Sequence, residues 1–373
     1  MTIGVVGGGQ LGRMLALAGY PLGRDFLFLD RSADTPAGQV APSLCGEFTD
    51  RRLLRELARR TELITFDWEN VSLEGLRALG RDARIAPPLA ALAMSQDRIA
   101  EKRMFVRLGI PTTRYAAVQS RASLGRALRS VGLPGVLKTR RLGYDGKGQA
   151  VVRSRDDAYR ALEALGAVPL IYEEFVPFEY EVSTIGARST AGEVAVYPLN
   201  RNHHRDGILR LTRAPWGAPA IERRAAGYLR RVLAHFDYEG VLNIEFFVRG
   251  GRLYANETAP RVHNSGHWTI EGAVTSQFEN HLRAILGLPL GSTAASGHSA
   301  MVNLIGAVPS PAAVLALPGV HLHDYGKAPR PGRKLGHCTA VATTPERRDR
   351  VARRLLALAD PGTPAALRHR DLT

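Results

Sequence analysis

Cysteine is rare in this chain of 373 residues. Only Cys45 and Cys338 are present, and no CxxC pair occurs. Two distant cysteines exclude a disulfide-rich scaffold and disfavour a zinc site, which usually draws on closely spaced cysteines. Long apolar runs are also missing, so no segment is long enough to span a bilayer. Residues 1–9 are typical of a first strand rather than of a signal peptide. These absences predict a cytoplasmic protein with no membrane partner.

Lysine is rare as well. The 50 basic residues comprise 45 arginines and only five lysines. A chain that uses arginine almost everywhere is expected to keep lysine where a compact ammonium group is needed, although chance can also place five residues. The lysines are therefore candidate site residues, and they are Lys102, Lys138, Lys147, Lys327 and Lys334.

The formal net charge of +15 raises nucleic-acid binding as a hypothesis. The basic residues are nevertheless spread along the chain as single and paired arginines, with no Lys/Arg block and no basic stripe interleaved with aromatic residues. A positive cleft for an anionic small molecule explains the charge equally well. We expect a small-molecule substrate and no nucleic-acid partner.

Residues 137–149, LKTRRLGYDGKGQ, form the most distinctive stretch of the sequence. Lys138 ends an apolar, strand-like run, and three glycines and Lys147 precede a second strand-like run over residues 150–152. Glycines let backbone N–H groups approach a polyphosphate, and lysines supply charge. A strand follows where the GxxxxGK[ST] phosphate loop has a helix. The pattern predicts either a flap that closes over phosphates or an ordinary Gly-rich hairpin.

A second glycine motif stands near the start of the chain. A short apolar strand over residues 3–6 leads into Gly7, Gly9 and Gly12 and then into an amphipathic helix. This spacing matches GxGxxG, and Asp30 ends the next predicted strand, where a ribose-binding acid would stand. The motif is typical of nicotinamide dinucleotide sites, but any site that needs a close backbone approach uses the same glycines.

The region that follows alternates helices and strands. We expect helices over Arg51–Arg60 and residues 74–79 and a strand over Leu63–Phe66, which complete a small α/β domain. Ser95 is expected to cap the next helix. Arg98 and Lys102 lie four residues apart on that helix and hence on one face, which indicates either a phosphate contact or a solvated basic face.

Residues 202–207, NHHRDG, are expected to form a polar loop. His203 and His204 are adjacent, and successive residues of a regular strand point to opposite faces, so one metal ion would not meet both side chains. No carboxylate stands at a recognisable metal-ligand spacing from them. The sequence therefore does not favour a histidine metal site here.

A pair of glutamates carries the most informative chemistry. Glu245 and Glu257 lie in neighbouring predicted strands, and a three-residue turn over 250–252 would place them directly opposite each other. Opposed like charges repel, and a Mg²⁺ ion between them would remove the repulsion, with substrate phosphates and Asn256 supplying further oxygens. The alternative is another register that turns one glutamate to solvent.

The remaining chain begins with another polar cluster. Residues 259–268, APRVHNSGHW, are crowded with Arg, His and Asn and predict an anion or substrate site, and one helix is expected over residues 269–286. The Gly/Ala/Ser-rich residues 289–298 lead to a third, smaller unit. Its basic loop, residues 326–334, is either a surface charge run or a phosphate site.

Together these features resemble the ATP-grasp superfamily, which combines a glycine flap between strands, a lysine ahead of it, a pair of hinge glutamates and two metal carboxylates in a hairpin. Within the superfamily the chain is similar to the 5-(carboxyamino)imidazole ribonucleotide synthases of bacterial purine biosynthesis. The resemblance runs from about residue 3 to residue 339, and the tail beyond residue 340 does not share it. It rests on GGGQLGRML, SQDR, KTRRLGYDGKGQ, HRDGIL, SQFENHLRA, RPGRKLGH and, most specifically, ETAPRVHNSGHW.

The resemblance implies a fold of mixed α/β and α+β class with an ATP-grasp core. A Rossmann-like pre-ATP-grasp domain would occupy residues 1–94, the ATP-grasp domain 95–295 with an ATP lid at about 112–176, and a small C-terminal domain 296–373. The implied activity is that of an ADP-forming carbon–nitrogen ligase. It would use ATP, bicarbonate and Mg²⁺ or Mn²⁺ to carboxylate 5-aminoimidazole ribonucleotide through carboxyphosphate, as a homodimer.

Roles for individual residues follow from the same resemblance. Residues that would hold ATP are Arg98, Lys138, Gly143, Tyr144, Asp145, Gly146, Lys147, Gly148, Gln149, Glu173, Glu174, Phe175, Val176, Glu181, His204, Asn256 and Glu257, and the metal ligands would be Glu245 and Glu257. The ribonucleotide would meet Gln10, Leu11, Glu69, Tyr144, Asp145, Arg261, His263, Asn264 and Lys334, and its 5′-phosphate would meet Lys327 and Arg333. The residues that act in the chemistry would be Lys138, Lys147, Arg261 and His267, the last as the group that handles the substrate proton.

Three other functions compete with this interpretation. Another ATP-grasp ligase, such as a formate-using glycinamide ribonucleotide transformylase, would share the ATP site and differ in the APRVHNSGHW and RPGRK segments. A nicotinamide-dependent oxidoreductase rests on the first glycine motif and Asp30, and it leaves the glutamate pair and the second glycine loop unexplained. A nucleic-acid-binding protein rests on net charge alone.

Overall fold

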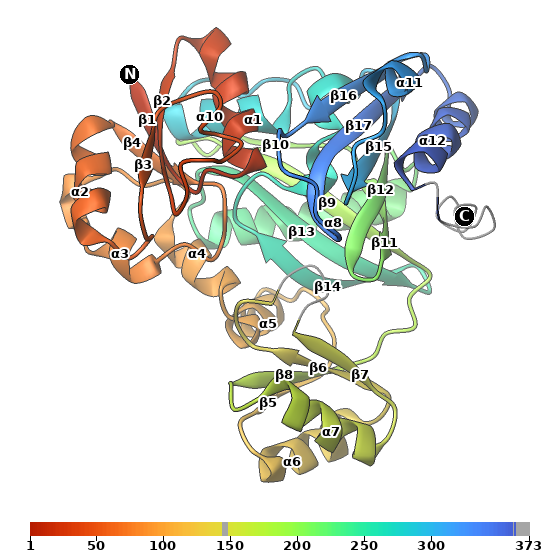
Figure 1. Ribbon diagram of the computed structural model, residues 1–373. Coiled ribbons are helices and arrows are strands. Elements are labelled where there is room, and N and C mark those ends of the chain that lie inside the picture. Colours follow the sequence, from red (N-terminus) through yellow and green to blue (C-terminus); the bar gives the residue numbers. More distant parts are fainter. Residues whose placement is uncertain (144–147, 361, 363–373) are drawn as a thin grey trace.

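Three β-sheets with helices on their faces organise the chain (Figure 1). The structure is a computed structural model that describes residues 1–143, 148–360 and 362. An N-terminal sheet and a long central sheet form a broad upper body, and a third sheet forms a lobe that projects from it (Figure 1). Within the described residues, no helix combines the length and the apolar character needed to cross a membrane.

The N-terminal sheet is parallel, with the strand order β3-β2-β1-β4. Strands β1, β2 and β4 are short apolar runs buried among helices, as parallel sheets require. The carboxyl ends of β1, β2 and β4 therefore present Gly7, Asp30 and Asp67 at one edge of the sheet. The elements of this region are β1 (Thr2–Val6), α1 (Gln10–Gly19), η1 (Tyr20–Leu22), β2 (Asp25–Asp30), β3 (Ser43–Cys45), α2 (Arg51–Arg60), β4 (Leu63–Phe66), α3 (Leu73–Arg77), η2 (Gly80–Asp82) and α4 (Leu89–Ser95).

Helix α5 (Arg98–Arg107) leads into the projecting lobe, and its cap differs from the prediction. Ser95 is the last residue of α4, and its hydroxyl donates to the carbonyl of Leu92. Asp97 is the cap, because its carboxylate accepts from the N–H groups of residues 99 and 100. The same carboxylate pairs with Arg140 at 2.6 Å, so one side chain both starts the helix and holds the segment that leads to the glycine loop.

The lobe is an antiparallel sheet with the strand order β5-β8-β6-β7. Lys138 on β6 pairs with Gln149 on β7, so two adjacent strands flank the glycine loop as predicted. Residues 144–147 of that loop lie outside the described residues. The elements of the lobe are β5 (Tyr115–Val118), α6 (Arg121–Val131), β6 (Gly135–Thr139), β7 (Gln149–Val152), α7 (Arg155–Leu165) and β8 (Leu170–Glu174), and the two helices pack on the sheet through one apolar cluster (Figure 1).

The central sheet runs in the order β14-β13-β9-β11-β12-β15-β17-β16, with β10 paired to β9. It continues without a break through the three strands of the C-terminal segment, so this segment adds its own core and helices but no separate sheet. The domain boundaries after residues 94 and 295 stay predictions. The elements are β9 (Tyr180–Arg188), β10 (Val194–Val196), β11 (Asn200–Arg205), β12 (Ile208–Ala214), α8 (Pro219–His235), β13 (Gly240–Arg249), β14 (Arg252–Ala259), η3 (Asn264–Gly266), α9 (Thr269–Gly272), α10 (Gln277–Leu286), β15 (His298–Ile305), α11 (Pro311–Leu315), β16 (Val320–Asp324), β17 (Lys334–Ala342) and α12 (Pro345–Ala359).

Two predictions about this half of the chain were wrong. The expected polar loop is strand β11, which pairs with β12 across a turn at Asp206 and Gly207, both with positive φ (54° and 75°). Asp-Gly is a strong hairpin signal, and the strand is polar because it faces the candidate site. The expected long helix is broken into α9 and α10, because the Ser276 hydroxyl accepts from the N–H of Glu279 and starts a new helix.

Candidate active site

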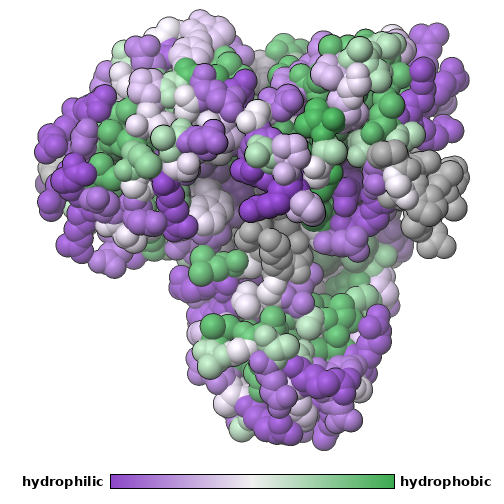
Figure 2. Space-filling model, in the orientation of Figure 1, coloured by the Kyte–Doolittle hydropathy of each residue, from purple (hydrophilic) through white to green (hydrophobic). Residues whose placement is uncertain are grey.

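Two adjoining cavities lie where the three sheets meet, and they measure about 750 and 350 Å³. Figure 2 shows hydrophilic side chains around a hollow in the middle of the upper body, above the lobe. Predicted site residues that line only the larger cavity are Gln10, Leu11, Glu69, Gly143, Arg261, Lys327 and Arg333. Those that line only the smaller one are Lys138, Gln149, Glu181, His204, Glu245 and Asn256. Both cavities are lined by Arg98, Glu257, His263, Asn264 and Lys334, so the two sets of residues meet at one junction.

The predicted glutamate pair is present. Glu245 on β13 stands directly opposite Glu257 on β14. The turn is shorter than predicted, because Gly250 and Gly251 alone connect Arg249 to Arg252, and this register would place Glu245 opposite Asn256. A β-bulge inserts Asn256 as an extra residue in β14 and moves Glu257 into place.

The two glutamates sit in unlike electrostatic surroundings. Burial, opposed by His204 and reinforced by the facing Glu257, raises the pKa of Glu245 to about 7. Burial also opposes ionisation of Glu257, but Arg98, which donates to it at 3.1 Å, acts together with Lys138 and His204 to lower its pKa. Among the described residues, the buried Oδ1 of Asn256 has no hydrogen-bond partner. The hairpin therefore presents carboxylate and amide oxygens that a further cation would stabilise.

A buried ion cluster lies behind the smaller cavity. Glu173 on β8 is 2% exposed and contacts Lys102 at 3.2 Å and Lys138 at 3.4 Å, and the Thr113 hydroxyl donates to it. Lys102 is therefore neither a solvated residue nor a phosphate contact, because its ammonium group also donates to Thr112 and to the carbonyl of Ala255. Lys138 reaches the cavity and Lys102 anchors α5 to the lobe and to β14.

The residues predicted to bind the adenine and the ribose of ATP differ in where their side chains lie. The Glu174 carboxylate pairs with Arg114 on the surface, and neither Glu173, Glu174, Phe175 nor Val176 lines a cavity with its side chain among the described residues. Glu181 faces the smaller cavity, and its carboxylate lies 2.8 Å from His204 Nδ1. Burial lowers the pKa of His204, but Glu181 outweighs it and the result is a pKa of about 9.

The first glycine motif has little capacity left for a dinucleotide. The N–H of Gly8 donates to Asp30 at 2.6 Å, and the N–H of Gly12 donates to Asp67 at 3.0 Å. In a dinucleotide site these amides face the pyrophosphate and the acid binds the ribose. Here carboxylates of the chain itself accept the hydrogen bonds of two of these amide N–H groups, so the amides are not free for a pyrophosphate. This arrangement opposes the nicotinamide hypothesis. Sequence reasoning missed Asp67, although its place after β4 at the carboxyl edge of the sheet was a usable signal.

Gly7 should tolerate no side chain. A Cβ atom at Gly7 would lie 1.7 Å from Asp67 Oδ1, and φ is +106° there. We expect Gly7→Ala to lower the free energy of unfolding by about 3 kcal/mol, through overpacking and backbone strain. Gly23→Ala is the matched control, because φ is +66° and nothing lies within 4 Å, so only about 1 kcal/mol of strain is expected. Denaturant unfolding of both variants measures the difference, and equal losses would contradict the packing argument.

The larger cavity is lined by cations from two parts of the chain. Arg261 pairs with Glu69, which joins the segment after β14 to the N-terminal domain. The Lys327 ammonium group donates to Gln10 Oε1 at 2.5 Å and lies near Arg333 and Lys334. Burial, followed by Arg333, lowers the pKa of Lys327 to about 8. These cations form a pocket suited to an anion such as a phosphate.

His267 was predicted as the proton-handling residue, but the part of the chain that the structure describes does not bring it to either cavity. Its side chain is fully buried and lines neither cavity among the described residues. Its ring packs against Phe278 and His337, and burial lowers its pKa well below the ordinary value. The sequence HNSGH does not distinguish its two histidines. The 3-10 turn η3 places the His263 side chain at the cavities and the His267 side chain in the core.

Four predicted residues lie outside the described residues, namely Tyr144, Asp145, Gly146 and Lys147. Their assigned roles stay predictions. Gly148 is described, and a Cβ atom there would lie 2.7 Å from Thr139 Oγ1, with φ at +69°. Glycine is therefore required at Gly148 by the backbone of the loop, whatever the loop binds.

Comparisons with known proteins agree with this geometry. Three family models match consecutive parts of the chain: the ribonucleotide synthetase preATP-grasp domain over residues 1–96, the ATP-grasp domain over 103–278 and the phosphoribosylaminoimidazole carboxylase C-terminal domain over 299–350. The fold and the site thus define an ATP-grasp ligase. A relative from Pseudomonas aeruginosa named N5-carboxyaminoimidazole ribonucleotide synthase is 54% identical over 339 residues, which cover 91% of this chain and 94% of the relative. This chain therefore belongs to the N5-carboxyaminoimidazole ribonucleotide synthase family.

Solved structures show the same similarity. The N5-carboxyaminoimidazole ribonucleotide synthetase of Thermus thermophilus is 52% identical and superposes with a TM-score of 0.92 over 96% of this chain and 98% of that one. The synthase of Aspergillus clavatus, solved in complex with ADP and 5-aminoimidazole ribonucleotide, is 33% identical with a TM-score of 0.90, and the match covers 96% of this chain and 98% of that one.

Proposed function

We propose that this chain carboxylates 5-aminoimidazole ribonucleotide at its exocyclic amine, using ATP and bicarbonate, to form 5-(carboxyamino)imidazole ribonucleotide. A bicarbonate oxygen attacks the γ-phosphorus of ATP, and ADP leaves. The amine then attacks the carbon of carboxyphosphate, or of carbon dioxide released from it, and phosphate leaves with the loss of one proton from the amine. The observation that carries the proposal is the junction of the two cavities, because residues such as Arg98 and Glu257 line both.

Residues of the smaller cavity fit the triphosphate. Lys138 and Arg98 bring positive charge to it, and phosphoryl transfer depends chiefly on charge neutralisation and positioning. Glu181 and His204 are suited to the ribose of ATP, and the backbone of residues 173–176 to its adenine. Lys147 remains part of the proposal as a second phosphate ligand in the glycine loop.

Glu245, Glu257 and Asn256 would hold Mg²⁺ or Mn²⁺. Their fit rests on the opposed carboxylates, on the raised pKa of Glu245 and on the unpartnered Asn256 oxygen. Mg²⁺ is usually bound by one or two carboxylates together with substrate phosphates and water. When bound, the ion neutralises charge that develops on the transferred phosphoryl group.

Residues of the larger cavity fit the ribonucleotide. Lys334 lies at the junction and Arg261 lines the same larger cavity, and Lys327 and Arg333 form a cationic corner suited to the 5′-phosphate. Gln10 and Leu11 from the start of α1 line the same cavity. Tyr144 and Asp145 stay proposed contacts from the glycine loop.

Lys327 gives the site a predicted pH dependence. An amine with a pKa of about 8 loses its charge as pH rises, so its attraction for phosphate is present below pH 8 and lost above it. We expect kcat/KM for the ribonucleotide to fall about tenfold from pH 7 to pH 9.5. Lys327→Arg should flatten this part of the profile, because arginine stays charged throughout. Superimposable profiles for the two proteins would remove Lys327 from phosphate binding.

The proposed activity is tested by ADP release from the purified protein with ATP, Mg²⁺ and bicarbonate. We expect strong stimulation by 5-aminoimidazole ribonucleotide that depends on bicarbonate. Stimulation by formate and glycinamide ribonucleotide instead would keep the ATP site and replace the substrate. Lack of ADP release with every acceptor would contradict the ligase assignment.

A homodimer and a cytoplasmic location also belong to the proposal. The family resemblance supports the dimer, and the two cysteines without a CxxC pair support a reducing compartment. Sedimentation velocity at micromolar concentration tests the dimer, and a single species near 40.5 kDa would contradict it.

A further inference from the structure

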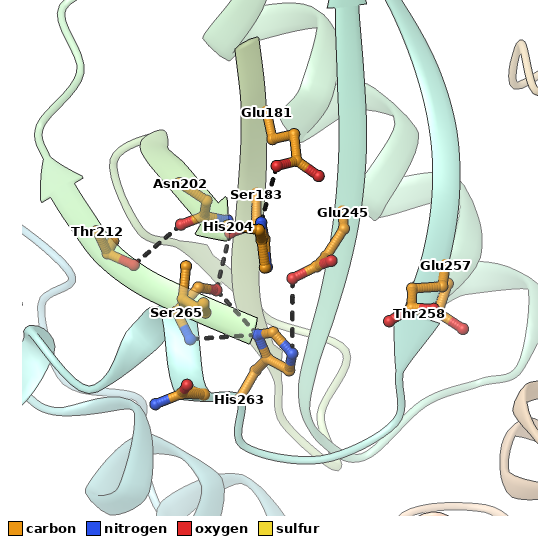
Figure 3. A network of polar contacts seen from close by, with 12 residues as sticks. Glu181, Ser183, Asn202, His204, Thr212, Glu245, Glu257, Thr258, His263 and Ser265 are labelled. Atoms are coloured by element: carbon orange, nitrogen blue, oxygen red, sulfur yellow. Dashed lines mark hydrogen bonds and ion pairs between the residues drawn. The ribbon is translucent and has the colours of Figure 1, made fainter. Parts of the chain in front are cut away.

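A buried chain of polar side chains runs from the central sheet to His263 (Figure 3). It begins on β12, where the Thr212 hydroxyl donates to Asn202 on β11, and the Asn202 amide donates to Ser183 on β9 at 2.8 Å. The Ser183 hydroxyl lies 2.8 Å from that of Ser265, which lies 2.9 Å from His263 Nδ1. Four of these five side chains, Thr212, Asn202, Ser183 and Ser265, are at most 4% exposed.

The nitrogen of His263 that faces this chain has a defined protonation. The backbone N–H of Ser265 also points to Nδ1, at 3.3 Å. A backbone N–H can only donate, so Nδ1 must accept and carry a lone pair. The ring proton then resides on Nε2, whichever way the serine hydroxyls are turned. If both ring nitrogens were protonated, the Nδ1–H group of His263 and the backbone N–H of Ser265 would point at each other, and neither could accept.

The backbone of His263 is fixed as firmly as its ring. Its N–H donates to Gln277 Oε1 at 3.0 Å, and its carbonyl accepts from Gln277 Nε2 at 2.7 Å. Gln277 is fully buried and starts helix α10. With backbone and Nδ1 both held, Nε2 faces the junction of the cavities, 3.7 Å from Glu245 Oε1.

We propose that Ser265 is a positioning residue that holds His263 in the tautomer protonated at Nε2, so that the nitrogen at the junction is a hydrogen-bond donor for an anionic oxygen. The inference rests on the proposed function, in which bicarbonate and carboxyphosphate oxygens occupy this junction. A donor there stabilises the negative charge of these species, as oxyanion donors do. Nε2 in this tautomer has no lone pair with which to take the proton from the substrate amine.

Two replacements of His263 separate a donor from a base. The amide of Gln reaches about the position of Nε2 and can donate there, whereas the amide of Asn lies closer to Nδ1, and neither amide takes up a proton at neutral pH. We expect His263→Gln to keep kcat within about tenfold of the wild type and His263→Asn to lose about 10²-fold to 10³-fold. Equal kcat values in the two variants, high or low, would overturn the proposal, as would a more active Asn variant.

Histidine ¹⁵N spectra of the resting protein test the tautomer without any turnover. His263, assigned by the signal missing from His263→Gln, should show an unprotonated Nδ1 and a protonated Nε2, and the opposite pattern would overturn the proposal. Ser265→Ala keeps the backbone N–H, so the tautomer protonated at Nε2 should persist, but the ring loses its hydroxyl partner at 2.9 Å and kcat should fall about tenfold with an unchanged KM for ATP. The control is Ser299→Ala, which removes a buried hydroxyl outside the chain of polar side chains and should change neither. A wild-type kcat in Ser265→Ala would show that the Ser265 hydroxyl positions nothing and would overturn its positioning role. Absence of bicarbonate-dependent turnover in the wild type would reject the proposed function and leave the tautomer result standing.

Discussion

Glu257→Gln is expected to lower the kcat of ADP formation by at least about 10³-fold. Glu257 is placed opposite Glu245 by the Asn256 bulge and accepts from Arg98, so one carboxylate joins the proposed metal ligands to a cation that lines both cavities. The neutral amide removes a charge from the metal site and frees Arg98 from its partner. Both changes disturb groups that stabilise the transferred phosphoryl charge.

A Mg²⁺ titration separates this effect from general damage. The apparent Mg²⁺ affinity of Glu257→Gln should weaken, and higher Mg²⁺ should restore only part of the activity. Glu193→Gln, a neutralised carboxylate on the exposed turn between β9 and β10, should behave as the wild type in both respects. Near-normal turnover and normal Mg²⁺ dependence in Glu257→Gln would refute the metal assignment.

Glu173→Gln is expected to destabilise the protein by about 3–5 kcal/mol. The substitution leaves the Lys102 and Lys138 ammonium groups buried with no carboxylate between them, and breaking a buried ion pair on one side has costs of this size. Burial alone would raise the pKa of Glu173, but Lys102 and Lys138 outweigh it and lower the pKa. The stabilisation that the ionised Glu173 provides is therefore fully present above its unfolded-state pKa of about 4.3. It is lost progressively as pH falls below that pKa.

A double-mutant cycle identifies the cause. Lys102→Met alone should also destabilise the protein, and the double variant Lys102→Met with Glu173→Gln should lose less than the sum of the single losses. In denaturant unfolding at pH 7, each single variant should lose a large part of the free energy of unfolding. The coupling free energy between the two sites should be about 1 kcal/mol or more, the size seen for contacting charges. Strict additivity would mean that Glu173 acts through Thr113 or packing rather than through the lysine.

The register of the glutamate hairpin shows how far sequence reasoning reaches. Opposition of Glu245 and Glu257 was predicted from a three-residue turn, and it arises instead from a two-residue turn and a bulge that compensate each other. The length of the turn and the position of the bulge depend on how the two glycines and Asn256 pair and pack with the neighbouring strand. The local sequence alone does not determine this pairing. The chemical demand for paired carboxylates was the reliable part of the inference.

Buried roles of polar residues were the hardest to predict. β11 was taken for a loop because a strand whose side chains form a polar site lacks the usual alternation with apolar residues. His267 and His263 are equally polar in sequence, and only the η3 turn decides which one faces the cavities. Lys102 was predicted either to contact a phosphate or to lie on a solvated face, because its partner Glu173 lies far away in the sequence.

Other elements followed directly from the sequence. Three of the four strands of the parallel sheet, β1, β2 and β4, were located to within one residue, since short buried strands between helices leave few alternatives. The rarity of lysine was informative as well. Of the four lysines in the described residues, Lys138, Lys327 and Lys334 line the cavities, and Lys102 lies directly behind them.

The most direct test of the account follows oxygen atoms from bicarbonate into phosphate. The protein is incubated with ATP, Mg²⁺, 5-aminoimidazole ribonucleotide and ¹⁸O-labelled bicarbonate for times shorter than the exchange of that label with water. If bicarbonate attacks the γ-phosphorus at the junction of the two cavities, each phosphate released carries one ¹⁸O atom, and its yield matches the ADP formed. Phosphate that carries no label, formed in equal amount with ADP, would mean that water is the acceptor and would contradict the proposed reaction.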